Sequence, residues 1–265
     1  MGREAAVGNK GNRDVSLLRT VELRKRFGAL NACDGVDFTV EKGEFLSLVG
    51  SNGAGKTTLV NLITAHLQPD SGRIVFEDRD ITSMTVAARI KAGIARSFQL
   101  VNLFDGLSVF DNVALSIFAR EGKTAKITAL AANDGDVRRE ARDVLAEFGL
   151  AVKSKLPAGE LAQGERKLLD VAVAYALRPK LLFLDEPTSG VSSAEKAQIM
   201  DTVSSVVRSG AVTAVVIEHD MDVVFRYSDR IVMMHEGAFL ADGPPDEIRA
   251  NEAVASILLG TPSPA

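Results

Sequence analysis

Lys56 and Thr57 end a glycine-rich stretch, GSNGAGKT at 50–57, that has the pattern G-x-x-x-x-G-K-[ST]. Glycines let backbone N–H groups turn inward around a phosphate chain, the lysine reaches the β- and γ-phosphates, and the threonine hydroxyl binds Mg²⁺. The alternative, a chance glycine-rich turn, is disfavoured because an apolar run precedes the stretch and a helical pattern follows it. The pattern predicts a nucleoside triphosphate site with Mg²⁺, formed by Gly50, Ser51, Asn52, Gly53, Ala54, Gly55, Lys56, Thr57 and Thr58.

Two acidic residues, Asp185 and Glu186, directly follow the apolar run Leu181–Leu184. The carboxyl end of a buried strand is where α/β sheets place their ligands. Asp185 is therefore predicted to be a partner of Mg²⁺, either directly or through one of its ligands, and Glu186 to act as the general base that polarises the water attacking the γ-phosphate. A solvated strand end is the alternative, and the phosphate-binding pattern upstream disfavours it.

Gln99 and His219 complete the set of residues with suitable chemistry. The Gln99 amide can offer its oxygen to the metal and its nitrogen to the water. His219 follows the apolar run Val212–Ile217 and could donate a hydrogen bond to the γ-phosphate, as a catalytic residue beside Lys56 and Glu186. A single Gln or His is uninformative by itself, so both hypotheses depend on the order of these residues along the chain.

The composition of the 265-residue chain limits its partners. A net charge of −4 gives no indication of a nucleic-acid-binding surface, so no nucleic acid is expected. The single cysteine, Cys33, excludes an internal disulfide and is expected to pack in the core. No apolar run reaches the roughly 18 residues of a membrane-spanning helix. We expect flexible tails at 1–15 and 261–265.

The elements that must position these residues follow from the apolar pattern. The runs 45–49, 181–184 and 212–217 are almost continuously apolar, as expected of parallel strands covered on both faces. The stretch from about 105 to 160 has Ala, Glu, Arg and Lys at helical spacing and no convincing strand. We interpret it as an α-helical subdomain, within about 100–165, inserted into an α/β core.

The chain before the phosphate loop has a less regular pattern. Leu17–Arg24 predicts a strand, Lys25–Gly28 a loop, and Val36–Val40 a second short strand. The whole stretch from 16 to 260 is predicted to form one domain with these additions.

A pentapeptide, LAQGE at 161–165, precedes a predicted helix and lies ahead of Asp185. The phosphate loop, Gln99, this pentapeptide, the Asp185-Glu186 pair and His219, in that order, resemble the ATP-binding subunit of ABC transporters. The resemblance implies a P-loop ATPase core with an antiparallel β subdomain. It also implies ATP hydrolysis by a head-to-tail dimer that encloses two nucleotides.

Further roles come only from this resemblance. Phe27 lies where the family places a ring that stacks on adenine. The residues that would face the second subunit's ATP are Leu161, Ala162, Gln163, Gly164 and Glu165, and those of the dimer-contact loop are Ser189, Gly190, Val191 and Ser192.

The chain departs from the family's L-S-G-G-Q signature at three positions: Ala162 replaces Ser, Gln163 replaces Gly, and Glu165 replaces Gln. In the contact loop, Ser192 stands where Asp is common. Gln163 would be strained if its backbone needed a positive φ. These changes could weaken one of the two ATP sites, which makes a heterodimer with a second ATPase subunit plausible and leaves a homodimer open. The phosphate loop and Glu186 are complete, so we expect an active ATPase.

A narrower resemblance is to the ATPase of branched-chain amino acid importers. It depends on RFGAL at 26–30, RSFQ at 96–99, VFDNV at 109–113, IEHDM at 217–221, and the end of the chain from Ile248. It implies integral membrane permeases as partners, and a periplasmic binding protein that acts through those permeases. The chain would be a peripheral protein on the cytoplasmic face of a bacterial inner membrane.

Three alternatives stay open at this point. The ATPase of a urea or short-amide importer, or of lipopolysaccharide export, shares much of the pattern. A soluble ABC ATPase working on DNA or ribosomes would usually carry coiled-coil insertions, zinc cysteines or a duplicated core. A small-molecule P-loop kinase would leave the LAQGE pentapeptide and His219 unexplained.

Overall fold

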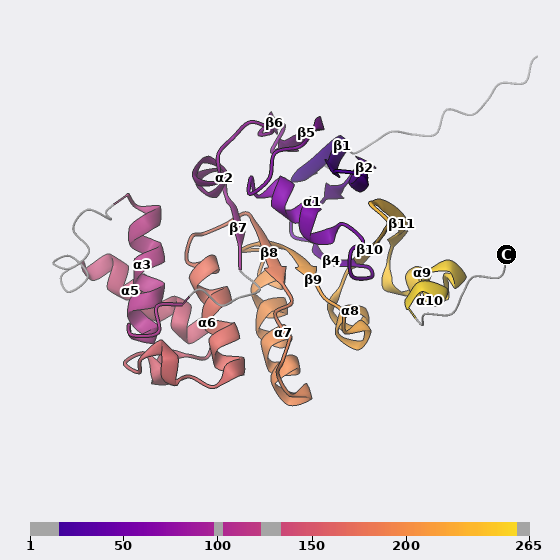
Figure 1. The fold of residues 1–265 in the computed structure, drawn as a ribbon. Helices are drawn as coiled ribbons and strands as arrows, with labels where there is room; N and C mark the ends of the chain where they lie inside the picture. Colours follow the sequence, from indigo (N-terminus) through magenta and orange to yellow (C-terminus); the bar gives the residue numbers. More distant parts are fainter. Residues whose placement is uncertain (1–15, 98–102, 123–133, 259–265) are drawn as a thin grey trace, which may run out of the picture.

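A computed structural model describes residues 16–97, 103–122 and 134–258. Its larger sheet has the strand order β11-β10-β4-β9-β8-β7 (Figure 1). All neighbouring pairs in this sheet are parallel except β10 and β11, which form a hairpin. In chain order its strands are β4 (Phe45–Val49), β7 (Ile94–Arg96), β8 (Leu181–Asp185), β9 (Thr213–Ile217), β10 (Arg230–His235) and β11 (Ala238–Gly243).

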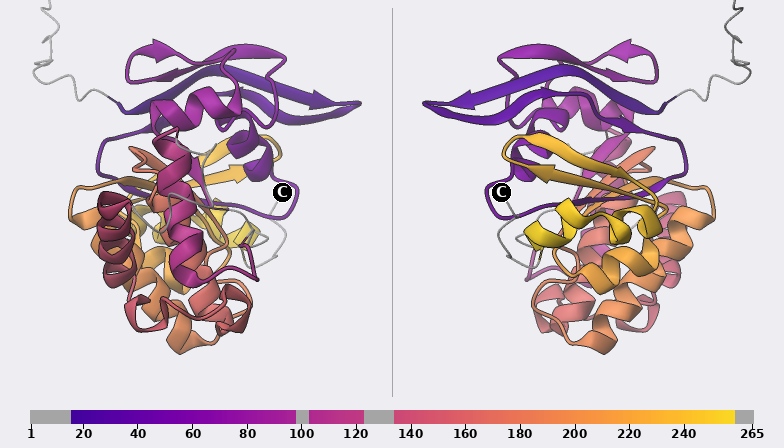
Figure 2. Two further views of the ribbon diagram at one scale, coloured as in Figure 1. Left: turned by 90° about the vertical axis from the view of Figure 1, so that its left-hand side faces the viewer. Right: turned by 90° about the vertical axis from the view of Figure 1, so that its right-hand side faces the viewer.

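A smaller antiparallel sheet forms a separate layer above the larger one (Figure 2). Its path is β2-β1-β5-β6, and β3 pairs with β1. The strands are β1 (Leu18–Phe27), β2 (Leu30–Val36), β3 (Thr39–Val40), β5 (Ser71–Phe76) and β6 (Arg79–Asp80). Helix α1 (Lys56–Ile63) contributes Leu59, Leu62 and Ile63 to the apolar core beneath this sheet.

The strands of the larger sheet send alternate side chains to two different cores, because successive residues of a strand point to opposite faces. Leu181 and Phe183 pack into the core shared with α1 and the smaller sheet. Leu182 and Leu184 pack on the other face, against helices. Both faces are therefore covered, which explains why these strands are continuously apolar in sequence.

Helices fill the second core. Four of them contribute most of its helical side chains: α3 (Val109–Arg120), α5 (Gly135–Glu147), α6 (Gln163–Tyr175) and α7 (Ser193–Arg208). The other helices of the described residues are α2 (Val86–Ala92), α8 (Met221–Tyr227), α9 (Pro245–Ala250), α10 (Glu252–Leu258), and the short 3₁₀ turns at Ala151–Lys153 and Ala158–Glu160. The predicted α/β core with an antiparallel sheet and an inserted helical region is confirmed. The predicted domain boundaries themselves stay predictions.

The prediction of a loop at Lys25–Gly28 is wrong. Strand β1 continues to Phe27, and only Gly28 and Ala29 form the turn before β2. Gly28 has φ +58°, a conformation that glycine adopts without a Cβ penalty. The predicted strand 36–40 is also displaced, since β2 begins at Leu30. The ends that meet at this turn, Phe27 and Leu30, are exposed, so a pattern of buried apolar residues does not reveal where the strands pair.

Arg89 of α2 is the largest fully buried side chain of the described residues, with 1% of its surface exposed. Its Nη1 donates to the carbonyl oxygens of Leu62 at 2.5 Å and Ile63 at 2.6 Å, and its Nη2 donates to Thr82 at 2.8 Å. Leu62 and Ile63 lie at the end of α1, where carbonyls have no partner within the helix. Burial lowers the pKa of Arg89 to about 10. Arg89 therefore fixes the end of the helix that begins at the phosphate loop.

We expect Arg89→Met to lower the free energy of unfolding by about 3 kcal/mol, because it leaves three carbonyls without this donor. Urea unfolding followed by circular dichroism measures the change. The control is Arg73→Met, at an exposed position on β5, which should change stability by less than about 0.5 kcal/mol. Equal effects of the two substitutions would contradict the assignment.

Candidate functional site

The glycine-rich loop joins β4 to α1 and passes close to other backbone segments. Gly50 has φ +148°, and a Cβ there would stand 2.1 Å from the Met234 carbonyl oxygen. Gly55 has φ +107°, and a Cβ there would stand 2.2 Å from the Ala32 carbonyl oxygen. The N–H of Gly237, in the β10–β11 turn, donates to the Ala54 carbonyl at 2.9 Å. Two strand segments thus hold the loop in place.

The Lys56 side chain folds back over this loop. Only 6% of the residue is exposed, and its Nζ donates to the carbonyl oxygens of Gly50 at 2.6 Å and Ser51 at 3.0 Å. Burial lowers the pKa of the Lys56 ammonium, and the nearby carboxylates of Glu186 and Asp185 oppose that shift. The ammonium is thus placed where a phosphate chain in the loop would meet it.

Asp185, Glu186 and His219 come together at the carboxyl ends of β8 and β9. Asp185, which is 5% exposed, pairs with Ile217 of β9. His219 follows two residues after Ile217. The His219 Nε2 lies 3.0 Å from a carboxylate oxygen of Glu186. Glu186 has φ +48°, a left-handed conformation that is costly for a residue with a Cβ. Such strain occurs where the surrounding structure holds a side chain for function.

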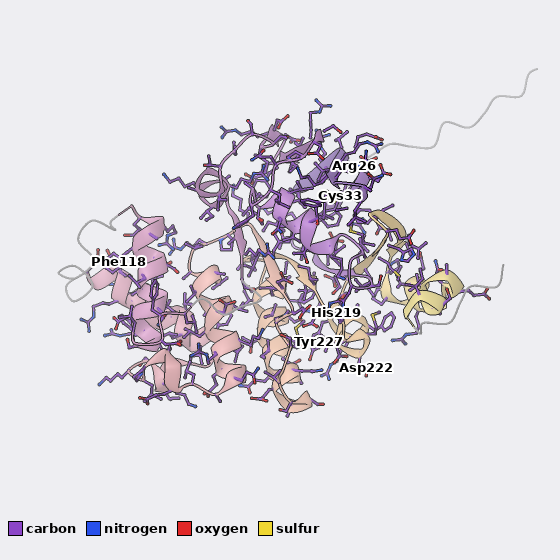
Figure 3. The ribbon with its side chains drawn as sticks, in the orientation of Figure 1. Arg26, Cys33, Phe118, His219, Asp222 and Tyr227 are labelled. Atoms are coloured by element: carbon purple, nitrogen blue, oxygen red, sulfur yellow. The ribbon has the colours of Figure 1, made fainter. Side chains whose placement is uncertain are left out.

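A cavity of about 300 Å³ joins these parts. One end is the loop and α1, and the opposite wall contains Asp185, Glu186 and His219, of which His219 is labelled in Figure 3. Phe27 and Leu30 line its outer end and are 46% and 61% exposed. The described residues that line it are Phe27, Leu30, Ala32, Asn52, Gly53, Ala54, Gly55, Lys56, Thr57, Thr58, Asp185, Glu186, Ile217 and His219.

This lining fits a nucleoside triphosphate with Mg²⁺. The cradle of the loop is a backbone surface in which added Cβ atoms would clash. Thr57 and Asp185 offer a hydroxyl and a carboxylate, the hard oxygen donors that Mg²⁺ takes beside phosphate oxygens and water. Among the described residues, no group of three or more His, Cys, Asp or Glu could hold a metal by itself. Gln99, the other predicted metal ligand, lies outside the described residues.

Three residues near the cavity were not singled out from the sequence. Glu218, 4% exposed, accepts hydrogen bonds from the N–H and hydroxyl of Thr188 and from the N–H of His219. Lys167 of α6 donates to the Glu186 carbonyl at 3.2 Å and to the Ser189 hydroxyl at 3.0 Å. Arg96 pairs with Asp185. A lone charged residue carries no sequence signal for such contacts between distant segments.

The LAQGE pentapeptide, 161–165, forms the start of α6 and lies outside the cavity lining. Ala162 is the N-cap, and its N–H donates to the Glu165 carboxylate at 3.2 Å. The other Glu165 oxygen pairs with the Lys153 ammonium at 2.5 Å, so the acidic residue is neutralised. Gln163 is helical and is absent from the positive-φ residues, so the strain considered for it does not arise.

The loop 189–192 connects Glu186 to α7. Ser192 caps α7, because its hydroxyl accepts from the Glu195 N–H and donates to the Glu195 carboxylate at 2.6 Å. Gly190 has φ +76°, and an added Cβ would stand 2.6 Å from the Gln163 amide nitrogen. The start of α6 and this loop therefore touch within one chain.

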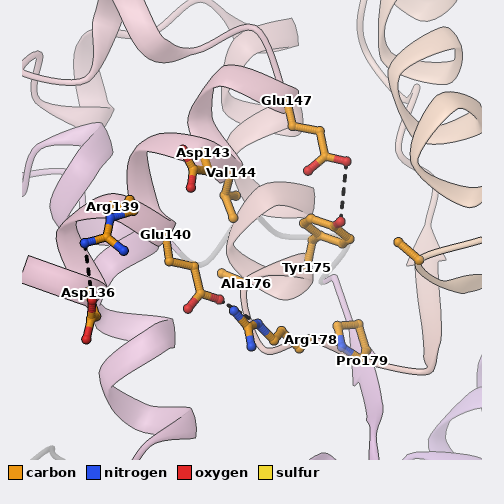
Figure 4. A pocket seen from close by; sticks show the side chains of 11 residues that line it. Asp136, Arg139, Glu140, Asp143, Val144, Glu147, Tyr175, Ala176, Arg178 and Pro179 are labelled. Atoms are coloured by element: carbon orange, nitrogen blue, oxygen red, sulfur yellow. Dashed lines mark hydrogen bonds and ion pairs between the residues drawn. The ribbon is translucent and has the colours of Figure 1, made fainter. Parts of the chain in front are cut away.

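A larger cavity, about 560 Å³, lies between α5 and the end of α6, away from the loop (Figure 4). Its charged groups mostly pair with one another, as in Arg178–Glu140 at 2.8 Å and Arg139–Asp136 at 3.5 Å. The Tyr175 hydroxyl donates to Glu147 at 3.4 Å. Within the part of the chain that the structure describes, none of the residues predicted from sequence to do chemistry lines it.

The chain is similar in sequence to known ATP-binding proteins of ABC transporters. A family model described as "ABC transporter" matches residues 33–189. The high-affinity branched-chain amino acid transport ATP-binding protein BraF of Pseudomonas aeruginosa is 33% identical over 249 residues, covering 92% of this chain and 98% of that protein. LivG of Escherichia coli, also a high-affinity branched-chain amino acid transport ATP-binding protein, is 31% identical over 250 residues with the same coverage.

Solved structures of ATP-binding cassettes share the fold of this chain. The ADP conformation of MJ1267, an ATP-binding cassette of an ABC transporter, superimposes with a TM-score of 0.82 at 31% identity and covers 92% of this chain and 99% of that one. A nucleotide-free ATP-binding cassette from an ABC transporter gives a TM-score of 0.81 at 30% identity. The predicted cassette fold is confirmed.

We expect Gly55→Ala to weaken nucleotide binding at least about tenfold, because its Cβ would meet the Ala32 carbonyl and displace the loop. Equilibrium binding of a fluorescent ATP analogue measures this. The control is Gly43→Ala, at φ +79° with nothing within 4 Å of the added Cβ, which should cost stability but leave affinity unchanged. Unchanged affinity in Gly55→Ala would show that the loop tolerates displacement.

Proposed function

The chain belongs to the ABC transporter family and hydrolyses ATP, and we propose that it energises the import of branched-chain amino acids. The observation that carries the proposal is the near full-length similarity to BraF and LivG, both named for branched-chain amino acid transport. This similarity is not confined to the nucleotide-binding motifs, because it spans 92% of the chain.

The roles of individual residues follow from the cavity. Lys56 would exchange the Gly50 and Ser51 carbonyls for phosphate oxygens, and the inward N–H groups of the loop would hold the chain. Glu186 would accept a proton from the attacking water. The His219 Nε2, 3.0 Å from Glu186, would orient that carboxylate in the absence of nucleotide and would turn its N–H to the γ-phosphate when ATP is bound. Thr57 and Asp185 would hold Mg²⁺, which when bound neutralises charge on the phosphates. Phe27 would stack on adenine.

We infer that the active form is a dimer. The LAQGE residues lie at the N-terminus of α6 but do not reach the cavity of their own chain, so they would face a second subunit's nucleotide. Ala162 has no hydroxyl to offer, whereas the pairing with Lys153 removes the repulsion that a bare Glu165 would exert on a phosphate. A different second subunit with an unaltered signature is the partner we favour, and a second copy of this chain is the alternative.

None of the described helices is both long and apolar enough to cross a lipid bilayer. As a transporter's ATP-binding subunit the chain would be membrane-associated. We propose integral membrane permeases as its direct partners, and a periplasmic binding protein that reaches it only through those permeases. We place it as a peripheral subunit on the cytoplasmic face of a bacterial inner membrane.

Lys56→Ala should abolish nucleotide binding, because the buried ammonium is the charge nearest the predicted phosphates. Binding of a labelled ATP analogue and steady-state phosphate release both measure the loss. Lys42→Ala, in the exposed turn after β3, serves as a control that should behave like the unmodified protein. Retained ATPase activity in Lys56→Ala would contradict the assignment of the phosphate loop.

Glu186→Gln should keep nucleotide affinity and lower kcat at least about a hundredfold, because the amide matches the carboxylate in shape but cannot accept the proton. Single-turnover hydrolysis separates the two quantities. Glu160→Gln, at an exposed position before α6, is the control and should keep full activity. A Glu186→Gln variant with normal kcat would place the general base elsewhere.

The transport proposal is tested by tagging Glu186→Gln, trapping it with ATP and Mg²⁺ in its native host, and identifying what co-purifies from solubilised membranes. Two permeases and a second ATPase would support the importer, whose binding protein can then be tested for leucine, isoleucine and valine. Recovery of lipid-export components, or of soluble partners alone, would contradict it while leaving the ATPase activity intact.

A further inference from the structure

Arg96, at the carboxyl end of β7, holds the carboxylate that is proposed to bind Mg²⁺. Its Nη2 lies 2.5 Å from Oδ2 of Asp185, and the two side chains are only 10% and 6% exposed. Its Nη1 donates to the amide oxygen of Asn61 on α1 at 2.5 Å. The guanidinium therefore bridges β8 and the helix that follows the phosphate loop.

The Asp185 carboxylate and three charged groups near it are balanced without a metal. Lys56 and Arg96 carry positive charges, and Asp185 and Glu186 carry negative ones. A divalent cation at Asp185 would add positive charge next to a guanidinium that is already within hydrogen-bonding distance of the same carboxylate. Because both groups are nearly dry, water would screen this repulsion only weakly.

We propose that Arg96 and Mg²⁺ compete for the Asp185 carboxylate, so that Arg96 sets the Mg²⁺ concentration at which the nucleotide binds tightly. The inference rests on the proposed metal role of Asp185. Asn61 makes the exchange feasible, because a guanidinium that gives up Asp185 keeps its second partner on α1 instead of becoming a buried, unsatisfied charge. Arg96 is thus a positioning residue that acts through Asp185.

The experiment titrates Mg²⁺ against binding of a labelled, non-hydrolysable ATP analogue, with affinity in EDTA as the baseline. Arg96→Gln removes the charge but keeps an amide that can donate to Asp185. We expect its half-saturating Mg²⁺ concentration to fall about tenfold, with baseline affinity unchanged. The matched control is Arg120→Gln, which breaks an Arg–carboxylate pair of the same 2.5 Å length with Glu140 in the helical region and should leave the Mg²⁺ requirement unaltered.

Two companion variants separate competition from structural support. Arg96→Lys keeps the charge and should keep the Mg²⁺ requirement close to that of the unmodified protein. Asn61→Ala removes the guanidinium's second partner without touching the ion pair, and should raise the requirement a few-fold. This opposite shift is available even if Arg96→Gln fails to fold. Damage to the fold could not produce the tightening expected of Arg96→Gln. It would lower the affinity in EDTA as well, so the Asn61→Ala shift is interpreted only where that baseline is unchanged.

The outcomes are distinguishable. A lower Mg²⁺ requirement in Arg96→Gln supports competition, and so does a higher one in Asn61→Ala whose affinity in EDTA is unchanged. An unchanged or higher requirement in Arg96→Gln, with normal Mg²⁺ dependence in the unmodified protein, overturns this inference and leaves the proposed function standing. Binding by the unmodified protein that is indifferent to Mg²⁺ overturns the metal role of Asp185, and the competition with it.

Discussion

The parallel register of β4, β9 and β8 is the constraint from which the site follows. Leu48 pairs with Ile217, and Ile217 pairs with Asp185. Because the carboxyl ends of neighbouring parallel strands lie at the same edge of the sheet, the three loops that follow these strands lie next to one another. One loop carries the glycines and Lys56, the second carries Glu186, and the third carries His219. A slip in this register would separate the acid from the phosphate loop and turn each strand's side chains into the wrong core.

Buried hydrogen bonds then fix the orientation of Glu186, which the strand register has brought to the site. The backbone of Glu186 adopts a left-handed conformation, and five hydrogen bonds hold it and its surroundings. The Glu186 N–H donates to the Ile217 carbonyl, and Lys167 donates to the Glu186 carbonyl. The Glu218 carboxylate accepts hydrogen bonds from both Thr188 and the His219 N–H. These bonds offset the strain, so the carboxylate meets His219 in a fixed orientation.

The sequence was sufficient for those parts of the fold and site that depend on local pattern. Strand β8, the loop at 50–57 and the helical region lie where continuous apolar runs, glycine spacing and helical periodicity predict them. The β1–β2 hairpin was mispredicted because its pairing depends on a two-residue turn between exposed strand ends. Strand β7 has only three residues, too few for a periodicity. Arg96 and Glu218 could not be found, because each acquires its role from contacts with residues distant in the chain.

Lys167 connects helix α6, which begins with the LAQGE residues, to the segment that carries Glu186. It holds the Glu186 carbonyl and the Ser189 hydroxyl. In the proposed dimer, that helix serves one nucleotide and Glu186 serves the other. A shift of α6 toward a second subunit's nucleotide would therefore also shift the support of this chain's own base, so one side chain couples the two proposed ATP sites.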